Sequence, residues 1–327
     1  EEIFKMKFDV IVGNPPYQLT TGGSKAQAVP IYNKFIEQAK KLGPRYLIMI
    51  VPDRWFSGGF GLNEFRSVML NDRRIVYLHD YPVASDCFPG VDIPGGVCYF
   101  LWNRDKEDDC EVRVSYGGKN TCLKRPLLED GCDVFIKYNE AVSIVKKVAG
   151  VKGKHFVDLI TSQRPFGMST TFEGSRKKTA ENNIVVYGRN KEIRYCSRKD
   201  ITSNDVLLKR CKVFIARAYG ERIAENFFVI GDPFVGGVNT ACTETYIAIG
   251  PFETKDICEN VRSYMRTKFF RFLVLLHKPT QDLLRGVYSF VPMQDFSKPW
   301  MDAELYKKYN LTQDEIKFIE SMIKPME

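Results

Sequence analysis

Apolar and polar positions follow two different periods along the first hundred residues. A short apolar run at residues 8–12 ends at Gly13, and longer runs at residues 46–51 and 97–102 have the length of buried strands. Apolar side chains instead recur every three or four positions in residues 31–41 and 62–70, as in amphipathic helices. With a further strand at 75–78, this order predicts an α/β fold with a largely parallel, doubly wound sheet.

The pattern changes after residue 104, where polar residues dominate. We expect a strand at 110–116, a helix at 133–148 and a linker at 150–154, where glycine and lysine alternate. Short strand-like runs follow at residues 184–187, 213–218, 227–230 and 245–249. A helix at 255–276 and two short charged helices within 302–323 complete the pattern. The chain is therefore expected to divide into residues 1–150, 151–300 and 301–327.

Positive charge is concentrated in one part of the chain. The net charge is +8, and residues 151–222 hold 16 Lys and Arg against 7 Asp and Glu. All of the excess therefore lies in this basic stretch, because the remaining residues are nearly balanced. Concentrated basicity is typical of a surface that binds a polyanion, although an ordinary solvated face is the alternative.

Cysteine content and hydrophobicity restrict the class of protein. The nine cysteines include no C-x-x-C pair, and only three histidines are present, so a structural zinc site is not expected. An odd number of cysteines without a signal peptide indicates reduced thiols and a cytoplasmic location. No run of eighteen apolar residues predicts a membrane span.

The tetrapeptide Asn14-Pro15-Pro16-Tyr17 directly follows the first predicted strand. Proline has no backbone N–H and holds the residue before it extended, so this loop is stiff. It follows the carboxyl end of a strand, where open α/β sheets bind their ligands. The side-chain oxygen of Asn14 and the carbonyl oxygen of Pro15 can both accept hydrogen bonds from one amino group, with the ring of Tyr17 beside it. These groups suit a base that has left the helix stack, and they permit direct methyl transfer without a nucleophilic cysteine.

With the strand before it, this stretch resembles motif IV of the amino-methyltransferases. Its Asn-led form is similar to that of adenine-N6 DNA methyltransferases of bacterial type II or IIG restriction–modification systems. The resemblance implies part of a Rossmann-like methyltransferase sheet in residues 1–150, a mixed α/β target-recognition domain in 151–300 and a helical tail in 301–327. It implies that Asn14, Pro15, Pro16 and Tyr17 are catalytic, and that a methyl group passes from S-adenosylmethionine to a flipped adenine in duplex DNA.

A second stretch, DCFPGVDIPGGVCYFLWNRD, resembles motif VIII of the same enzymes. The resemblance implies that Phe88 stacks on the flipped adenine opposite Tyr17, and a core aromatic before a turn is the alternative. The basic stretch then falls on the recognition domain. Its candidate DNA-binding residues are Arg164, Arg176, Lys177, Lys178, Arg189, Arg210 and Arg217.

The resemblance also implies where the cofactor site lies. In this family a Gly-rich turn and an acidic residue bind S-adenosylmethionine ahead of the N-P-P-Y motif, and only thirteen residues precede Asn14. We therefore expect a C-terminal fragment that lacks the main cofactor motif and is inactive alone. Residues 232–237 (DPFVGG) are similar to the cofactor turn of permuted methyltransferases, but too few residues separate Gly237 from Tyr246 for a crossover helix. We assign this segment to target recognition.

Other functions remain open at this point. Protein-glutamine methyltransferases also carry N-P-P-Y, but they end within about a hundred residues of it. Asp232 with Glu253 and Lys255 imitates a D…E-x-K nuclease site loosely. The chain could also be a non-catalytic DNA-binding specificity fragment, or the methylase portion of a fused restriction endonuclease. The resemblance leaves a cognate endonuclease, fused or separate, as an open partner beside double-stranded DNA.

Overall fold

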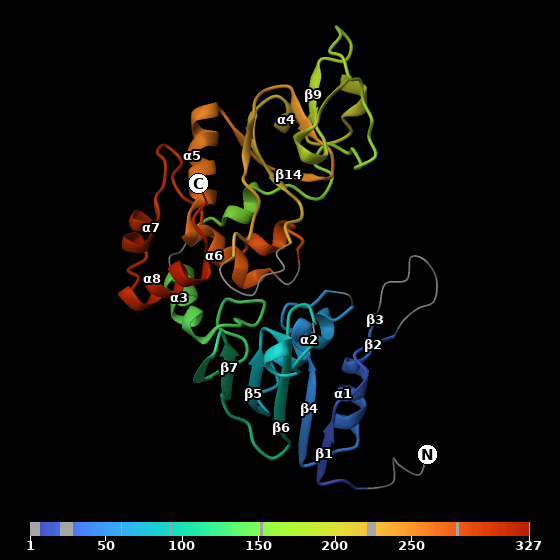
Figure 1. Ribbon diagram of the computed structural model, residues 1–327, viewed down its shortest axis with the longest axis vertical. Coiled ribbons are helices and arrows are strands. Elements are labelled where there is room, and N and C mark those ends of the chain that lie inside the picture. The colour runs from blue at the N-terminus through green and yellow to red at the C-terminus, as the bar shows by residue number, and fades with distance from the viewer. Residues whose placement is uncertain are drawn as a thin grey trace. The chain divides into compact units, whose positions relative to one another are not determined.

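The computed structural model of the chain describes residues 7–19, 29–59, 61–91, 93–150, 153–220, 227–278 and 281–326 (Figure 1). They form two compact units, Glu1–Val142 and Ser143–Glu327. The division falls within helix α3 (Asn139–Ala149) rather than at residue 150. Residues 151–152 of the predicted linker lie outside the described residues.

The first unit is built on a six-stranded sheet with the order β1-β4-β6-β5-β7-β8. Its strands are β1 (Val10–Gly13), β4 (Tyr46–Pro52), β6 (Val97–Asn103), β5 (Ile75–Tyr81), β7 (Cys110–Tyr116) and β8 (Lys119–Arg125). Figure 1 shows most of these strands side by side. β1 pairs with β4 and β5 with β7 in parallel, whereas β4–β6, β5–β6 and β7–β8 are antiparallel.

The sheet is therefore mixed, and the prediction of a largely parallel sheet is wrong. A parallel pairing of β5 with β6 would need a crossover of a dozen or more residues, usually a helix. The residues between these strands instead contain only a 3-10 turn, η3 (Ala84–Asp86), among those described. They are rich in Gly and Pro, and β6 returns antiparallel between β4 and β5. The α/β composition itself is as predicted.

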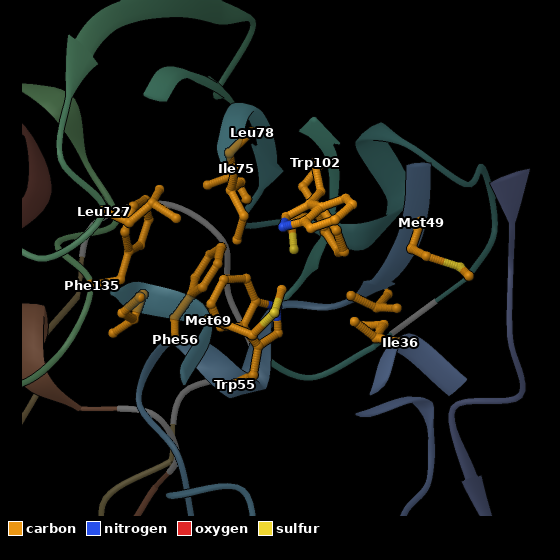
Figure 2. Packing of buried hydrophobic residues seen from close by; sticks show 14 of the residues in the cluster. Ile36, Met49, Trp55, Phe56, Met69, Ile75, Leu78, Trp102, Leu127 and Phe135 are labelled. Carbon is orange, nitrogen blue, oxygen red and sulfur yellow. The ribbon is translucent and has the colours of Figure 1, made fainter. Parts of the chain in front are cut away.

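One face of this sheet carries the hydrophobic core of the unit. Alternate residues of β4 point into it, so Leu47, Met49 and Val51 are almost fully buried. Helices α1 (Tyr32–Lys41) and α2 (Asn63–Leu70) and the 3-10 turn η2 (Asp53–Phe56) add side chains to the same cluster. Figure 2 shows Ile36 near Met49, and Trp55 near Met69. Within the described part of this unit, the helices share a single face of the sheet.

The opposite face of the sheet is apolar and partly exposed. A row of neighbouring residues crosses four strands in register: Val12, Ile48, Leu101 and Tyr77. Val12 is 69% exposed, and the other three are half-buried. β1 forms one edge of the sheet among the described residues. Among the described residues, the helices of this unit thus cover one face, not the two faces that a doubly wound sheet would have covered.

The second unit contains two three-stranded sheets. The first has the order β10-β9-β13 and the second β12-β11-β14. The strands are β9 (Ile184–Tyr187), β10 (Ile193–Cys196), β11 (Cys211–Ala216), β12 (Phe234–Gly236), β13 (Thr240–Cys242) and β14 (Tyr246–Phe252). Side chains of both sheets, among them Val186, Phe214 and Ala248, form one core cluster. Residues 227–230 were expected to form a strand, but Phe227 makes only an isolated bridge to Ile323.

Helices of the second unit are labelled in Figure 1. They are α4 (Asp205–Leu208), α5 (Lys255–Arg266), α6 (Lys268–His277), α7 (Asp302–Lys308) and α8 (Gln313–Met322). In sequence, α4 lies between β10 and β11, and α5 to α8 follow the sheets. The predicted helix at 255–276 is broken at Thr267, whose backbone is extended and whose side chain accepts a hydrogen bond from the N–H of Phe270. Such a cap starts a new helix. The tail helices belong to this unit, where Glu315 of α8 accepts hydrogen bonds from Ser143 and Lys147 of α3.

Candidate active site

The N-P-P-Y tetrapeptide lies directly beyond the carboxyl end of β1. Gly13 pairs with Met49 of β4, so Asn14 begins the loop where two parallel strands end at the same edge. Pro15 is buried, Tyr17 is half-buried, and the side chain of Asn14 is exposed. The carbonyl of Tyr17 accepts a hydrogen bond from the N–H of Ile31 (3.2 Å), the residue before α1. This is the position that the sequence predicts for a ligand-binding loop of an α/β sheet.

The tetrapeptide lines a groove of about 560 Å³, a volume in the range of small-molecule sites. Beside the four residues of the motif, the groove is lined by Gln18, Phe88, Val91 and Ile93. The structure therefore brings together all five residues that were proposed from the sequence for catalysis and base stacking. It does so although Phe88 lies 71 positions beyond Tyr17 in the chain.

Phe88 is held by the turn that follows η3. Its N–H donates to the carbonyl of Ala84 (2.8 Å), and its own carbonyl accepts from the N–H of Val91 (3.0 Å). Gly90 has φ +80, a conformation that favours glycine, and it allows the chain to reverse between these two bonds. Phe88 is half-buried at the groove, so it is not a fully buried core side chain.

The Tyr17 side chain lies in the same groove as the segment that carries Phe88. Burial raises the pKa of Tyr17, and the thiols of Cys87 and Cys98 raise it further. Burial also raises the pKa of Cys87 above that of a free thiol, so this cysteine is a poor nucleophile at neutral pH. The surroundings of the groove thus suit binding through a ring and polar acceptors rather than covalent chemistry.

No charged side chain lines the groove among the described residues. The described residues also hold no group of three His, Cys, Asp or Glu side chains that could bind a metal ion. Within the same residues, no helix has the length and apolar character needed to cross a lipid bilayer. The sequence pointed to Phe88 through motif VIII, but it gave no signal for Gln18, Val91 and Ile93, since their place in the groove depends on how the chain folds.

The candidate DNA-binding residues all lie in the second unit, and they differ in their surroundings. Arg164 pairs with Glu244, Arg210 with Glu253, and Arg217 lies 4.0 Å from Asp282. The other four are exposed and make no ion pair within the part of the chain that the structure describes: Arg176, Lys177, Lys178 and Arg189. Residues 151, 152, 221 and 222 of the basic stretch lie outside the described residues.

The segment that is similar to a permuted cofactor turn forms antiparallel strands. β12 and β14 both pair with the central strand β11 in antiparallel fashion, and only β13 lies between them in sequence. Asp232, proposed as part of a loose nuclease pattern, instead accepts from Arg262 (3.0 Å) and lies 3.3 Å from Arg266. This arrangement agrees with our rejection of a crossover helix here, and Glu253 pairs with Arg210 rather than with a metal site.

Comparisons with known proteins give one family match and one relative with substantial sequence identity. Residues 1–88 match the family described as Eco57I restriction-modification methylase. A protein of Mycoplasma pneumoniae, described as an uncharacterized adenine-specific methylase, is 36% identical over 123 residues. This alignment covers 36% of the chain and 29% of the relative, so the chain spans less than a third of that protein. These two matches confirm the resemblance to adenine-specific restriction–modification methylases that the motifs indicated.

Two solved structures resemble larger parts of the chain at low identity. The type IIG restriction endonuclease BpuSI is 12% identical, with a TM-score of 0.38 over 98% of this chain and 50% of the other. The type IIL restriction-modification enzyme MmeI, solved in complex with DNA, is 10% identical, with a TM-score of 0.41 over 86% of this chain and 45% of the other.

Proposed function

Because residues 1–88 match the Eco57I restriction-modification methylases, we propose that this chain carries the methyl-acceptor site of a site-specific adenine-N6 DNA methyltransferase. The observation that carries the proposal is the groove in which Asn14, Pro15, Pro16, Tyr17 and Phe88 meet. It combines two stiffly held acceptors with two half-buried rings, which is what a flipped base with an amino group requires.

The acceptor chemistry follows from the groups at the end of β1. The Asn14 side-chain oxygen and the Pro15 carbonyl oxygen accept hydrogen bonds from the N6 amino group of adenine. These bonds favour a tetrahedral nitrogen whose lone pair points at the incoming methyl group. Tyr17 and Phe88 hold the plane of the base, so the nitrogen stays in line for transfer. The two prolines keep the loop rigid, so little conformational entropy is lost when the base binds.

S-adenosylmethionine is the proposed methyl donor, and its main binding residues lie outside the groove. The donor carries a sulfonium and an ammonium group, whereas the described lining of the groove has no carboxylate to pair with them. The apolar row of Val12, Ile48, Leu101 and Tyr77 and the edge strand β1 offer a surface for a further cofactor-binding part. Titration of the chain with S-adenosylmethionine tests this proposal, and saturable binding by this chain alone would contradict it.

The second unit is the proposed target-recognition part. Its exposed cations at 176–178 and at Arg189 are available for DNA phosphates, because they make no ion pair among the described residues. Arg164, Arg210 and Arg217 would exchange a carboxylate for a phosphate. The nine free cysteines suit the proposed cytoplasmic location of a restriction–modification protein, since thiols stay reduced in that compartment. A restriction endonuclease activity, fused or separate, is part of the same proposal.

A fluorescence experiment tests whether the groove takes a base. Duplexes are selected from a randomised pool by binding to the chain, and then remade with 2-aminopurine in place of each adenine in turn. One position should brighten when the protein binds, because 2-aminopurine emits more strongly outside the helix stack. Phe88→Ala should weaken capture of this base by about 5-fold or more, since base–aromatic stacking contributes roughly 1–3 kcal/mol.

Phe35→Ala is the matched control, because Phe35 is 46% exposed on α1 and does not line the groove. Brightening that is equal in wild type and the Phe88→Ala variant would refute the stacking role. Selective binding without brightening at any adenine would instead favour a DNA-binding specificity fragment that does not flip bases.

A further inference from the structure

A glycine pair ends the loop that forms one wall of the groove. This wall loop (residues 87–91 and 93–96) carries Phe88, Val91 and Ile93 and leads into β6. Gly95 and Gly96 have φ +100 and +106. A Cβ on Gly96 would lie 2.2 Å from the carbonyl oxygen of Tyr81, so only glycine fits this close approach.

Two side chains from distant parts of the first unit hold this glycine pair. The Lys137 ammonium donates to the carbonyl of Gly95 and forms an ion pair with Asp53. The backbone N–H of Asp53 donates to the carbonyl of Gly96 (3.2 Å). The Asp53 carboxylate also packs on the glycines, since a Cβ would meet it at 3.0 Å on Gly95 and at 2.9 Å on Gly96. Lys137 and Asp53 therefore hold both glycines of the turn in place.

The clasp formed by Asp53 and Lys137 is enclosed by the protein. The Asp53 side chain is 3% exposed and that of Lys137 is 23% exposed. Asp80 of β5 is fully buried, and the nearby Asp53 carboxylate contributes to raising its pKa. Burial raises the pKa of both acids, most strongly that of Asp80, whereas Lys137 lowers both. Asp53 is the acid that forms the ion pair with Lys137.

Backbone hydrogen bonds continue from the glycine pair to the groove. The N–H of Gly96 donates to the carbonyl of Ile93 (3.0 Å), and the N–H of Val91 donates to the carbonyl of Phe88 (3.0 Å). Asp53 also directly follows β4, the strand that pairs with β1 and ends at the same edge. The clasp thus connects β4, the strand beside the N-P-P-Y loop, to the wall loop on the other side of the groove.

We propose that Asp53 and Lys137 are positioning residues that fix the wall loop, and with it Phe88, at the distance from Tyr17 that a single base requires. The use of that distance for a flipped adenine rests on the function proposed above. A buried ion pair often gives no more stability than apolar residues of the same size, because desolvation offsets its attraction. Here the ion pair supplies orientation, because the Lys137 ammonium has to contact both the Asp53 carboxylate and the Gly95 carbonyl.

Hydrogen exchange tests the positioning without DNA. In Lys137→Met the amides of Phe88, Val91 and Gly96 should exchange about tenfold faster, as expected when a charge-assisted hydrogen bond is removed. Lys137→Gln should show a smaller increase, because its amide still donates to the Gly95 carbonyl. Lys124→Met is the matched control, since Lys124 pairs with Asp108 (2.8 Å) on the surface of the same unit.

Two lysine variants are used so that the exchange measurement can still be made on one of them if the other does not fold. Unchanged exchange of the wall loop in a folded variant would overturn the proposal. Faster exchange throughout the six-stranded sheet, equal to that in the wall loop, would also overturn it, because the clasp would then serve stability alone.

Acrylamide quenching of 2-aminopurine provides the functional readout. With the base in the groove, wild type should shield it, and Lys137→Met should let acrylamide quench it several-fold more strongly at unchanged DNA affinity. Equal shielding by both proteins would overturn the positioning role. If wild type does not shield the base while exchange still rises in the variant, the clasp stands and the proposed acceptor function fails.

Discussion

Asp72 is expected to contribute measurably to the stability of the first unit at neutral pH. Its carboxylate lies between α2 and β5 and accepts from three side chains: Lys40 Nζ (2.8 Å), Arg74 Nε (2.7 Å) and Trp102 Nε1 (2.9 Å). The donors come from α1, the residue before β5, and β6, so this one side chain ties together three elements of the first unit. Its side chain is only 6% exposed.

The magnitude follows from the pKa. Burial alone would raise the pKa of Asp72, but hydrogen bonds from Arg74 and Lys40 outweigh this and lower it to about 2, from 3.8. A difference of nearly two pKa units corresponds to about 2.4 kcal/mol, and solvent screening at the edge of the sheet reduces this to about 1–2 kcal/mol. The folded-state pKa is depressed, so this stability is present above pH 4 and is lost as the pH falls toward 2.

The test compares wild type with Asp72→Asn, both in a Trp300→Phe background so that Trp55 and Trp102 report on the first unit alone. Urea unfolding is followed by fluorescence at pH 5, 3 and 2. The difference in the free energy of unfolding should shrink by about 1–2 kcal/mol across this range. Asp109→Asn is the control, because Asp109 pairs with Arg73 (3.4 Å) at the surface of the same unit, where solvent screens the pair. A difference for Asp72→Asn that does not change with pH would refute the reasoning.

Two further predictions concern the second unit. Replacing the cations at 176–178 by alanine should weaken DNA binding and reduce the slope of log affinity against log salt concentration by roughly 0.9 for each phosphate that is no longer neutralised. Arg210→Ala should change this slope less, because Arg210 already pairs with Glu253. Binding isotherms at several salt concentrations measure both effects. Burial lowers the pKa of Lys212, which donates to the Thr240 carbonyl, to about 8. The unfolded chain therefore binds more protons between pH 8 and 10, so wild type should gain stability across this range in urea unfolding, and Lys212→Met should not.

Local patterns in the sequence predicted most elements of the first unit. β4 and α1 stand close to their predicted bounds, since a continuous apolar run and a 3.6-residue period are strong signals. β8 gave no such signal, because its residues, KNTCLKR, are mostly polar on an edge strand. The strand predicted at residues 227–230 is wrong, because an apolar run there does not form a strand. These residues are apolar, but Val229 has φ +71 and makes no strand, so burial alone explains their composition.

Some residues of the candidate site could be predicted from the sequence, and others could not. Asn14 to Tyr17 could be found because a strand, a stiff loop and a recognisable motif stand next to each other in the sequence. Phe88 was found only through the second motif. The clasp could not be found, because Asp53 and Lys137 are 84 positions apart and each, taken alone, looks like an ordinary surface residue. Only the fold shows that both residues lie against the glycine pair of the wall loop.

The identity of the methylated nucleoside tests the central claim most directly. The natural full-length protein, rather than this chain alone, is incubated with labelled S-adenosylmethionine and DNA that lacks methylated bases, and the digested nucleosides are identified by mass spectrometry. We expect N6-methyladenine alone, and its loss in Asn14→Ala with DNA affinity unchanged, because the proposed partner of Asn14 is the amino group and not the phosphates. Methylation of cytosine, or full methylation of adenine by the Asn14→Ala variant, would contradict this account.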